Sequence, residues 1–369
     1  MHAFRALTLN VWGLPTARDR AARIRAVAGY LARADLDVVA IQEAWLPADR
    51  RTLIAGAAQG GLIHARTYNP ALAGSGLMIL SRWPVVESGF TPYLLNGDPF
   101  TPDFYAPKGI AHARLDAPFG PLDVYTTHAL AQHSNIGGVD RYQPHRIAQM
   151  VQFARLVVNR SAGAPALALA DFNVLPGSPG YRVFLPLGGF GEAVASVRPA
   201  VPAITYDSRN PYAPQTLTRR LDYIFYRGGP SLALRPTAAE ITHRDTPRGS
   251  GLPAYSDHYG VLATFEVEPA PPRVAGSARD DVLRREMARE AADILRGGLA
   301  DARARQRRWG ALAALGISAA GILARTRRRR WLALPGAGAM AGAALTALTI
   351  AELRALHSLL GELEVLIHE

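Results

Sequence analysis

The sequence predicts an α/β (α+β) protein in which two packed mixed β-sheets are flanked by helices as a four-layer sandwich, followed by a C-terminal helical membrane hairpin. Short apolar runs typical of buried strands outnumber helical patterns over the first 268 residues, and several follow one another as in β-hairpins. A purely parallel sheet would need a helix between almost every pair of strands. Two long uncharged stretches then occupy the C-terminal part of the chain.

The expected strands and helices follow from the apolar runs and their spacing. A first strand is expected over residues 4–10 and a second over 37–42, with a helix between them at about 18–34 whose apolar residues recur at helical spacing. Another helix is expected at about 142–160. The other predicted strands are 76–81, 109–115, 122–127, 166–170, 221–226 and 260–267.

The chain is predicted to divide at a proline-rich segment, residues 268–273. The expected parts are 1–268 as the main domain, 269–308 as a proline-rich linker and basic amphipathic helix, and 309–369 as two apolar membrane helices and a C-terminal helix. A bilayer helix needs about 20 apolar residues. The uncharged stretch 331–351 has 21 residues and meets this length, whereas 309–324 has 16 and is short unless flanking arginines lengthen it.

The tail has an alternative interpretation as an alanine-rich soluble helical hairpin. In either case, Gly338 and Gly342 form a small-xxx-small pair. Such a pair lets two helices approach closely, so it permits self-association.

The formal net charge of +11 is concentrated near the tail. Residues 1–270 have 25 basic and 20 acidic side chains (+5), and residues 271–330 have 15 and 6 (+9). Such a basic segment suits an anionic partner, either a membrane or a nucleic acid. The absence of cysteine excludes disulfides, thiolate zinc sites and cysteine nucleophiles. Because the N-terminus enters a strand by about Phe4, no cleaved signal peptide is expected and a cytoplasmic main domain is favoured.

Polar residues stand where buried strands end or begin, at four places in the first 260 residues. They are Asn10, Gln42-Glu43, Asp171-Phe172-Asn173 and Asp257-His258. Together they can place a hard divalent cation beside a proton-transfer group, which predicts a metal-assisted phosphodiesterase. Asp171 could orient an attacking water, and Asn173 could donate to a phosphate oxygen. Taken singly, each has a structural explanation, such as a turn at an asparagine or an arginine partner for Glu43.

Two histidines and one lysine are candidates for proton transfer and phosphate binding. His258 is flanked by carboxylates and is a candidate general base, with Asp222 as the acid that fixes its tautomer. His128 could stabilise charge on a phosphate or protonate a leaving group. Lys108 is the only lysine, and its compact ammonium could bind phosphate as a point charge.

Taken together, these residues resemble the endonuclease/exonuclease/phosphatase superfamily with the deoxyribonuclease-I-like fold, and within it the neutral sphingomyelinases that carry a membrane-anchored tail. The matching strings run nearly end to end: Leu9-Asn-Val-Trp-Gly-Leu-Pro15, Gln42-Glu-Ala-Trp45, Gly74-Ser-Gly-Leu77, Lys108-Gly109, Thr127-His128 with Ala131, Ala170-Asp-Phe-Asn173, Arg220-Leu-Asp-Tyr223 and Ser256-Asp-His258. The chain departs from the family's pattern at Leu130 and Gln132, which leaves the head-group preference open.

The resemblance implies a phospholipase C-type enzyme that hydrolyses sphingomyelin or a related (lyso)phospholipid to ceramide or another lipid alcohol and a phosphorylated head group. It implies Mg²⁺, with Mn²⁺ as an alternative, bound by Glu43 with Asn10 and Asp257 beside it. It also implies His258 as the base oriented by Asp222, phosphate contacts from His128, Asn173 and Lys108, and positioning of the nucleophile by Asp171.

Two other functions fit parts of the sequence. A nuclease or an inositol-phosphate phosphatase of the same superfamily would use the same site, but neither needs two long uncharged stretches, so no nucleic-acid partner is expected. A membrane scaffold with a decayed site would have lost at least one expected ligand, and all are present. The expected partners are a phospholipid or sphingolipid substrate and an anionic membrane. The apolar loop at 92–105 is either a rim that touches the bilayer or an ordinary surface loop.

Overall fold

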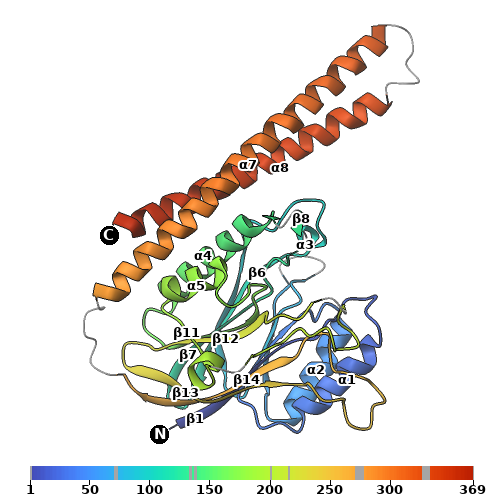
Figure 1. The fold of residues 1–369 in the computed structure, drawn as a ribbon. Helices are drawn as coiled ribbons and strands as arrows, with labels where there is room; N and C mark the ends of the chain where they lie inside the picture. The colour runs from blue at the N-terminus through green and yellow to red at the C-terminus, as the bar shows by residue number, and fades with distance from the viewer. Residues whose placement is uncertain are drawn as a thin grey trace.

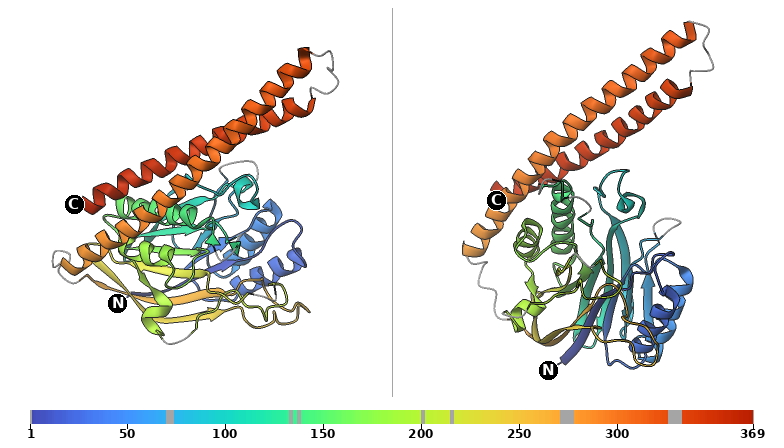
Figure 2. Two further views of the ribbon diagram at one scale, coloured as in Figure 1. Left: turned by 45° about the horizontal axis from the view of Figure 1, so that its top comes forward. Right: turned by 45° about the vertical axis from the view of Figure 1, so that its right-hand side comes forward.

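The computed structural model describes residues 2–69, 74–132, 135–136, 139–199, 202–214, 217–270, 278–325 and 333–368. Two six-stranded mixed sheets pack face to face, and helices cover the outer face of each (Figures 1 and 2). This arrangement confirms the predicted fold class. Each strand and helix that the sequence predicts within residues 1–268 is present, and its ends lie within three residues of the predicted ones.

The first sheet has the strand order β13-β14-β1-β2-β4-β3. Its strands are β1 (His2–Asn10), β2 (Val38–Gln42), β3 (His64–Thr67), β4 (Met78–Ser81), β13 (Leu232–Thr242) and β14 (Gly260–Pro269). β1 runs antiparallel to β14 and parallel to β2, with Asn10 opposite Gln42. Because parallel strands run in the same direction, the carboxyl ends of β1 and β2 meet at one edge of the sheet.

The second sheet has the strand order β11-β12-β10-β7-β6-β5. Its strands are β5 (Val85–Pro92), β6 (Gly109–Ala117), β7 (Gly120–Thr127), β10 (Ala166–Asp171), β11 (Gly191–Glu192) and β12 (Asp222–Arg227). β10 runs parallel to β7 and antiparallel to β12, with Asp171 opposite Asp222. A short pair of strands, β8 (Asn135–Ile136) and β9 (Val139–Asp140), lies outside both sheets.

Helices form the outer layers of the sandwich (Figure 2). The larger ones are α1 (Arg20–Leu31) and α2 (Pro47–Gln59) on the first sheet, and α4 (Gln143–Arg160) and α5 (Pro179–Gly188) on the second. Two short helices, α3 (Pro102–Tyr105) and α6 (Ala193–Val197), lie in connections between strands.

Strand β10 shows how the layers are held together. Its side chains alternate, so that Leu167 and Leu169 enter the apolar core between the sheets, while Ala166, Ala168 and Ala170 face α4 and α5. A strand that is buried on both faces in this way reads as a continuous apolar run. The polar residue that ends it therefore lies at the rim of the core.

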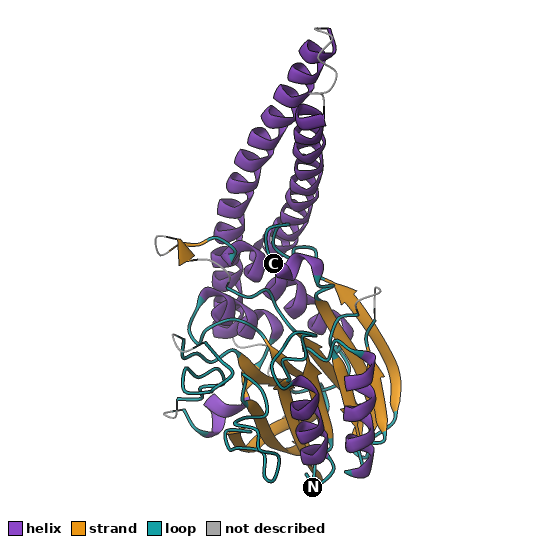
Figure 3. Cartoon of the chain, turned by 90° about the vertical axis from the view of Figure 1, so that its right-hand side faces the viewer, coloured by secondary structure: helices purple, strands orange, loops and turns teal. Residues whose placement is uncertain are grey.

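The C-terminal helices α7 (Ala278–Arg325) and α8 (Ala333–His368) form a long hairpin. Its base, residues 278–302 and 352–368, packs on α4 and α5 and adds Leu295, Leu299 and Leu359 to their apolar cluster. Its tip, residues 309–325 and 333–351, extends away from the sandwich (Figures 1 and 3). The hairpin thus combines a docked half and a projecting half.

The structure differs from the predicted tail in one respect. The basic amphipathic helix and the uncharged stretch 309–324 were expected as separate elements, but they belong to the single continuous helix α7, because no residue between them breaks the helix. Among the described helices, only α8 is long and apolar enough to cross a membrane. The linker prolines at 271–272 and the arginines at 327–330 lie outside the described residues.

Candidate active site

The polar residues predicted from strand ends come together at one edge of the sandwich. Asn10 ends β1, Asp171 ends β10, and Asp222 begins β12 directly opposite Asp171. His128 follows β7 and forms a bridge with Asp171, and His258 lies two residues before β14. Because central strands of both sheets contribute, the edge combines side chains that are far apart in the sequence.

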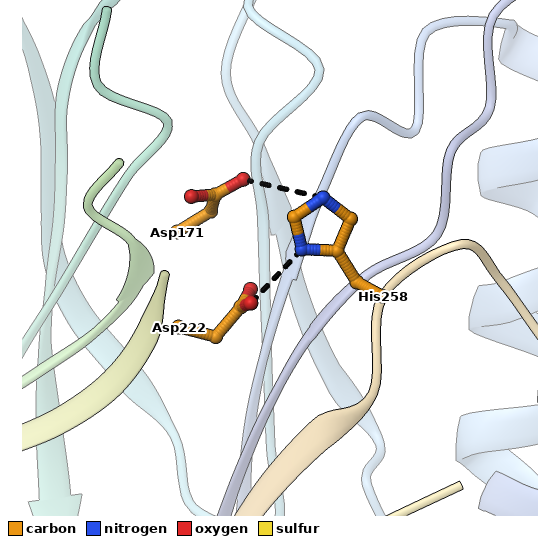
Figure 4. A group of neighbouring side chains, drawn as sticks. All are labelled: Asp171, Asp222 and His258. Carbon is orange, nitrogen blue, oxygen red and sulfur yellow. Dashed lines mark hydrogen bonds and ion pairs between the residues drawn. The ribbon is translucent and has the colours of Figure 1, made fainter. Parts of the chain in front are cut away.

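His258 stands between two buried carboxylates (Figure 4). Its Nδ1 donates to Oδ2 of Asp222 at 2.9 Å, and its Nε2 lies 3.8 Å from Oδ2 of Asp171. Asp222 is fully buried and Asp171 is 1% exposed. The contact with Asp222 fixes the ring's tautomer and orientation, so Nε2 is the nitrogen available for proton transfer.

The surrounding negative charges stabilise the protonated form of His258. Burial by itself lowers the pKa of an imidazole, but the negative charges of Asp222, Asp257 and Asp171 outweigh burial and raise the pKa of His258 well above its ordinary value. Burial and the charge of Asp222 also raise the pKa of Asp171. The carboxylates around it thus favour the protonated form of His258, which must lose this proton before it can act as a base.

Asn10 connects Asp171, which lies beside His258, to Glu43. Its Nδ2 donates to Oε1 of Glu43 at 2.9 Å and to Oδ2 of Asp171 at 3.0 Å, while its Oδ1 accepts from the backbone N–H of Trp12. The Asn10 side chain is fully buried. It therefore holds two carboxylates in place with one amide group.

Two glycines allow the backbone conformation that aims Glu43 into the site. Glu43 has φ +61°, the left-handed region that costs a residue with a β-carbon about 1–3 kcal/mol. A β-carbon at Gly13 would lie 2.2 Å from the Glu43 carbonyl oxygen, and one at Gly76 would lie 3.2 Å from the Glu43 Cα. The glycines of the strings after Asn10 and around Gly76 are thus explained by close approach to this residue.

Two groups of side chains could hold a divalent cation. Ligand atoms of Asp171, Asp222 and His258 all lie within 4.8 Å of one another. In that group, however, the imidazole already lies between the two carboxylates, 2.9 Å from Asp222 and 3.8 Å from Asp171. The second group is the predicted one, in which burial and the charge of Glu43 raise the pKa of Asp257 to about 7.

The second group fits Mg²⁺ better on chemical grounds. A cation beside Glu43 and Asp257 would favour the ionised form of Asp257 against burial and the charge of Glu43, and both side chains offer the oxygen ligands that Mg²⁺ prefers. Asn10 donates its amide N–H to Glu43 and so holds that carboxylate in place. We therefore favour the Glu43 group as the candidate metal site.

His128 lies between the two groups. Its Nε2 is 3.6 Å from Oδ2 of Asp171 and its Nδ1 is 3.9 Å from Oε1 of Glu43. Burial, and then the positive charge of Lys108, lower the pKa of His128 to about 4. At neutral pH it is therefore uncharged, which suits a hydrogen-bond donor better than a counter-ion.

The two remaining predicted phosphate contacts are turned toward the protein. Nζ of Lys108 donates to the carbonyl of Ala129 at 3.0 Å and lies 3.0 Å from Oδ1 of Asp103, and its side chain is 3% exposed. Nδ2 of Asn173 also donates to the Ala129 carbonyl at 3.0 Å. Asn173 borders the catalytic cleft, whereas Lys108 stands behind it.

The catalytic cleft has a volume of about 360 Å³. Predicted residues in its wall are Glu43, His128, Asp171 and Asn173, and the neighbouring residues include Leu14, Trp45, Asp103, Gln132, Tyr206, Leu217 and Arg219. Behind this wall, Asn10 contacts Glu43 and Asp171, and the His258–Asp222 pair lies beside Asp171. The wall of the cleft therefore combines carboxylates and an imidazole with apolar side chains such as Leu14 and Leu217.

Sequence reasoning missed Tyr206 and Arg219. The backbone of Tyr206 pairs with both Arg219 and His258, and its ring lies 4.9 Å from the imidazole of His258. Arg219 donates to Oε1 of Gln132 at 3.0 Å. The only signal for Arg219 in the sequence is its position just before the strand that carries Asp222.

A comparison with protein families identifies the arrangement. The sequence model of the endonuclease/exonuclease/phosphatase family matches residues 7–258, from β1 to the predicted base. The chain belongs to this family. The membership confirms the resemblance seen in the sequence, and it identifies the chain as a hydrolase of the phosphodiesterase type.

Several curated relatives of this chain are named for an activity on sphingolipids. The chain is similar to the inositol phosphosphingolipids phospholipase C of Schizosaccharomyces pombe, with 30% identity over 76% of this chain and 73% of the relative. It is 28% identical to a putative neutral sphingomyelinase of Drosophila melanogaster, over 71% and 61% of the two chains. Sphingomyelin phosphodiesterase 2 of Homo sapiens is 27% identical over 73% and 66%.

Solved structures from the same comparison share the fold. Sphingomyelinase C from Streptomyces griseocarneus has a TM-score of 0.54 and 21% identity, covering 72% of this chain and 99% of that one. TDP2 from D. rerio, complexed with a single-strand DNA product, has a TM-score of 0.56 and 20% identity, covering 72% and 100%. At this level of sequence identity the solved structures support the fold alone and do not indicate the substrate.

Proposed function

We propose that the chain is a Mg²⁺-dependent phospholipase C-type phosphodiesterase that hydrolyses sphingomyelin or a related (lyso)phospholipid. The products are ceramide or another lipid alcohol and a phosphorylated head group. The observation that carries the proposal is the direct contact of Asn10 with both Glu43 and Asp171, beside the His258–Asp222 pair. The named activities of the curated relatives support the lipid substrate.

In the proposed reaction, a water attacks phosphorus in line with the departing lipid oxygen. The water oxygen bonds to phosphorus, the bond between phosphorus and the lipid oxygen breaks, and the water proton passes to Nε2 of His258. That proton then reaches the lipid alkoxide. Asp222 keeps Nδ1 of His258 protonated and so directs Nε2 toward the cleft. Asp171, 3.8 Å from Nε2, positions the water.

The metal would be held by Glu43 and Asp257, with Asn10 beside it. When bound, Mg²⁺ or Mn²⁺ supplies positive charge that neutralises the phosphate and stabilises the leaving oxygen. His128 and Asn173 contribute neutral donors at the cleft wall, and Lys108 adds a positive charge behind them. The positive charge of the metal would also lower the pKa of the nearby His258, so the base would become easier to deprotonate.

The hairpin explains how such an enzyme reaches an insoluble substrate. We propose that residues 1–268 are the catalytic domain, 269–308 the proline-rich linker and basic helix, and 309–369 the two apolar helices and the C-terminal helix. The tip of the hairpin would be the membrane anchor, with the catalytic domain on the cytoplasmic side. The exposed apolar side chains of the tip and the basic residues around it suit an anionic bilayer. Gly342 already packs against α7 of the same chain. Of the predicted glycine pair, only Gly338 is therefore open to a second copy of the chain.

A nuclease is the second candidate. It is favoured by the fold shared with TDP2 from D. rerio, complexed with a DNA product, and by the net charge of +11. An inositol-phosphate phosphatase would use the same cleft. Both candidates leave the apolar hairpin tip without a role, which is why we rank them below a lipid substrate.

One assay separates these functions. The full-length protein, purified in detergent and assayed with Mg²⁺, is presented in parallel with sphingomyelin, phosphatidylinositol, a soluble inositol phosphate and plasmid DNA. Release of a phosphorylated head group from a lipid, without nicking of DNA, supports the proposal. DNA nicking or phosphate release from the soluble ester alone contradicts it. Glu43→Gln and His258→Ala serve as inactive controls that exclude a contaminating hydrolase.

A further inference from the structure

A second cavity continues the catalytic cleft on one side. Its volume is about 230 Å³, and it shares Gln132 and Asn173 with the cleft. The polar residues in its wall are Gln132, Asp140, Gln143, Arg146, Asn173 and Ser178. The head group stays bonded to phosphorus throughout the proposed reaction, so it must lie next to the phosphate. This cavity is therefore placed where a head group has to go.

Two guanidinium groups flank the passage between the cleft and the cavity. Arg146 lies in the cavity wall, with a side chain only 7% exposed, and Arg219 lies in the cleft wall and donates to Gln132. Arg219 donates to Gln132, which lies in the walls of both the cleft and the cavity, and Arg146 donates to the carbonyl of the adjacent Ala131. A positively charged ligand in this passage would lie close to both guanidinium groups.

Arg146 is held in a fixed position. It pairs with Asp140, and its Nη1 donates to the carbonyl of Ala131 at 3.3 Å. Gln143 stands beside it at the start of α4, and Ser178 stands opposite, at the start of α5, where its side chain makes no capping hydrogen bond. Amide, hydroxyl and guanidinium groups thus converge on the cavity from two helices.

The described wall of the cavity has no aromatic side chain. Recognition of a quaternary ammonium such as choline depends on aromatic faces around the cation. Hydroxyl groups and anionic groups instead need hydrogen-bond donors and acceptors, which this wall supplies. The cavity is therefore suited to a hydroxyl-rich head group and unsuited to a cationic one.

We propose that this cavity is the head-group subsite, and that Gln143, Arg146 and Arg219 select phospholipids with a hydroxyl-rich, non-cationic head group, such as phosphoinositol, over those with phosphocholine. The proposal rests on the phospholipase function proposed above and narrows its substrate class. Gln132 takes part by connecting Arg219 to the cavity.

The test compares two substrates with the same ceramide, one with phosphoinositol and one with phosphocholine as head group, in identical mixed micelles with Mg²⁺. The full-length protein is expected to have a kcat/KM at least about tenfold higher for the phosphoinositol lipid, as one lost charge-assisted hydrogen bond predicts. Arg146→Gln is expected to reduce that ratio about tenfold, and Gln143→Leu about threefold.

Gln59→Leu is the matched control, because Gln59 is an exposed residue at the end of α2, on the opposite face of the sandwich. It should leave the ratio unchanged. Gln143→Leu keeps the test informative if Arg146→Gln fails to fold. Equal rates on both lipids, a preference for phosphocholine, or an unchanged ratio in Gln143→Leu overturns the head-group assignment alone. Hydrolysis of neither lipid overturns the proposed function as well.

Discussion

The catalytic edge and the hairpin tip depart from the usual distribution of side chains in opposite ways. At the edge, charged and polar groups are buried: Asp222 is fully buried and His258 is 6% exposed. At the tip, large apolar side chains face outward, with Leu315 and Ile317 each 66% exposed. Buried charges and exposed apolar patches are both costly in a protein that interacts only with water.

The base of the hairpin makes the contrast sharper, because it belongs to the same two helices as the tip. Leu295, Leu356 and Leu359 in the base are buried against α4 and α5. Apolar residues in the same helices are therefore covered where the sandwich offers a surface and exposed where it does not. The exposed tip is what the proposed membrane anchor would need, as the buried charges of the edge suit the proposed metal-assisted reaction.

The largest expected effect is on catalysis at the edge. His258→Ala should lower kcat by about 10²–10⁴-fold, because it removes the proposed general base. Steady-state hydrolysis of the preferred lipid measures the loss, and the melting temperature shows that the variant is folded. Near-native turnover in a folded His258→Ala protein would mean that His258 is not the general base and that this edge is not the catalytic site.

The base and the tip should differ strongly in their contribution to stability. Leu359→Ala in the base is expected to cost about 2–5 kcal/mol, because it leaves a cavity in a packed core. Leu315→Ala in the tip, on a side chain that is already exposed, should cost less than about 0.5 kcal/mol. Denaturant unfolding in detergent compares the two. Equal losses would mean that the tip also packs on protein.

Membrane binding should depend on the tip alone. Met340→Arg places a charge in the exposed part of α8 and should weaken partition into anionic vesicles by about 2.5–3.5 kcal/mol, the cost of arginine near the centre of a bilayer helix. Val365→Arg, on the exposed side of the base of the same helix, is the matched control and should bind normally. Vesicle co-sedimentation measures both. If Val365→Arg alone lost binding, the base of the hairpin, and not the tip, would be the part that contacts the membrane.

The smallest expected effect is a shift in pH dependence. Activity should rise with pH, because His258 has a raised pKa and must lose its proton to act as a base. Asp222→Asn removes a negative charge that raises this pKa, so the ascending limb of kcat/KM should move to lower pH, while kcat falls. A limb that stays in place would assign the titration to another group.

Strands that are buried on both faces could be predicted from the sequence, whereas edge elements could not. β10 reads as an uninterrupted apolar run because its six residues are all buried. β13 was missed because it is an edge strand with alternating exposure and contains Pro236 at an irregular register. Helix α5 was missed because Pro186 lies inside it.

For the candidate site, the sequence indicated which side chains carry the chemistry, since polar residues that end buried strands are unusual enough to be recognised. It could not indicate protonation. His258 and His128 are both strand-end histidines, yet the pKa of one is raised and that of the other is lowered to about 4. The difference comes from carboxylates and a lysine supplied by other strands.

The sequence by itself determined the sandwich, the strand-end residues and the apolar tail, because each follows from local composition and periodicity. Only the tertiary structure decided that Arg146 and Arg219 flank a second cavity, that Lys108 stands behind the cleft, and that half of the hairpin is docked. Those features depend on distances between residues that are remote in the chain, which local patterns do not encode.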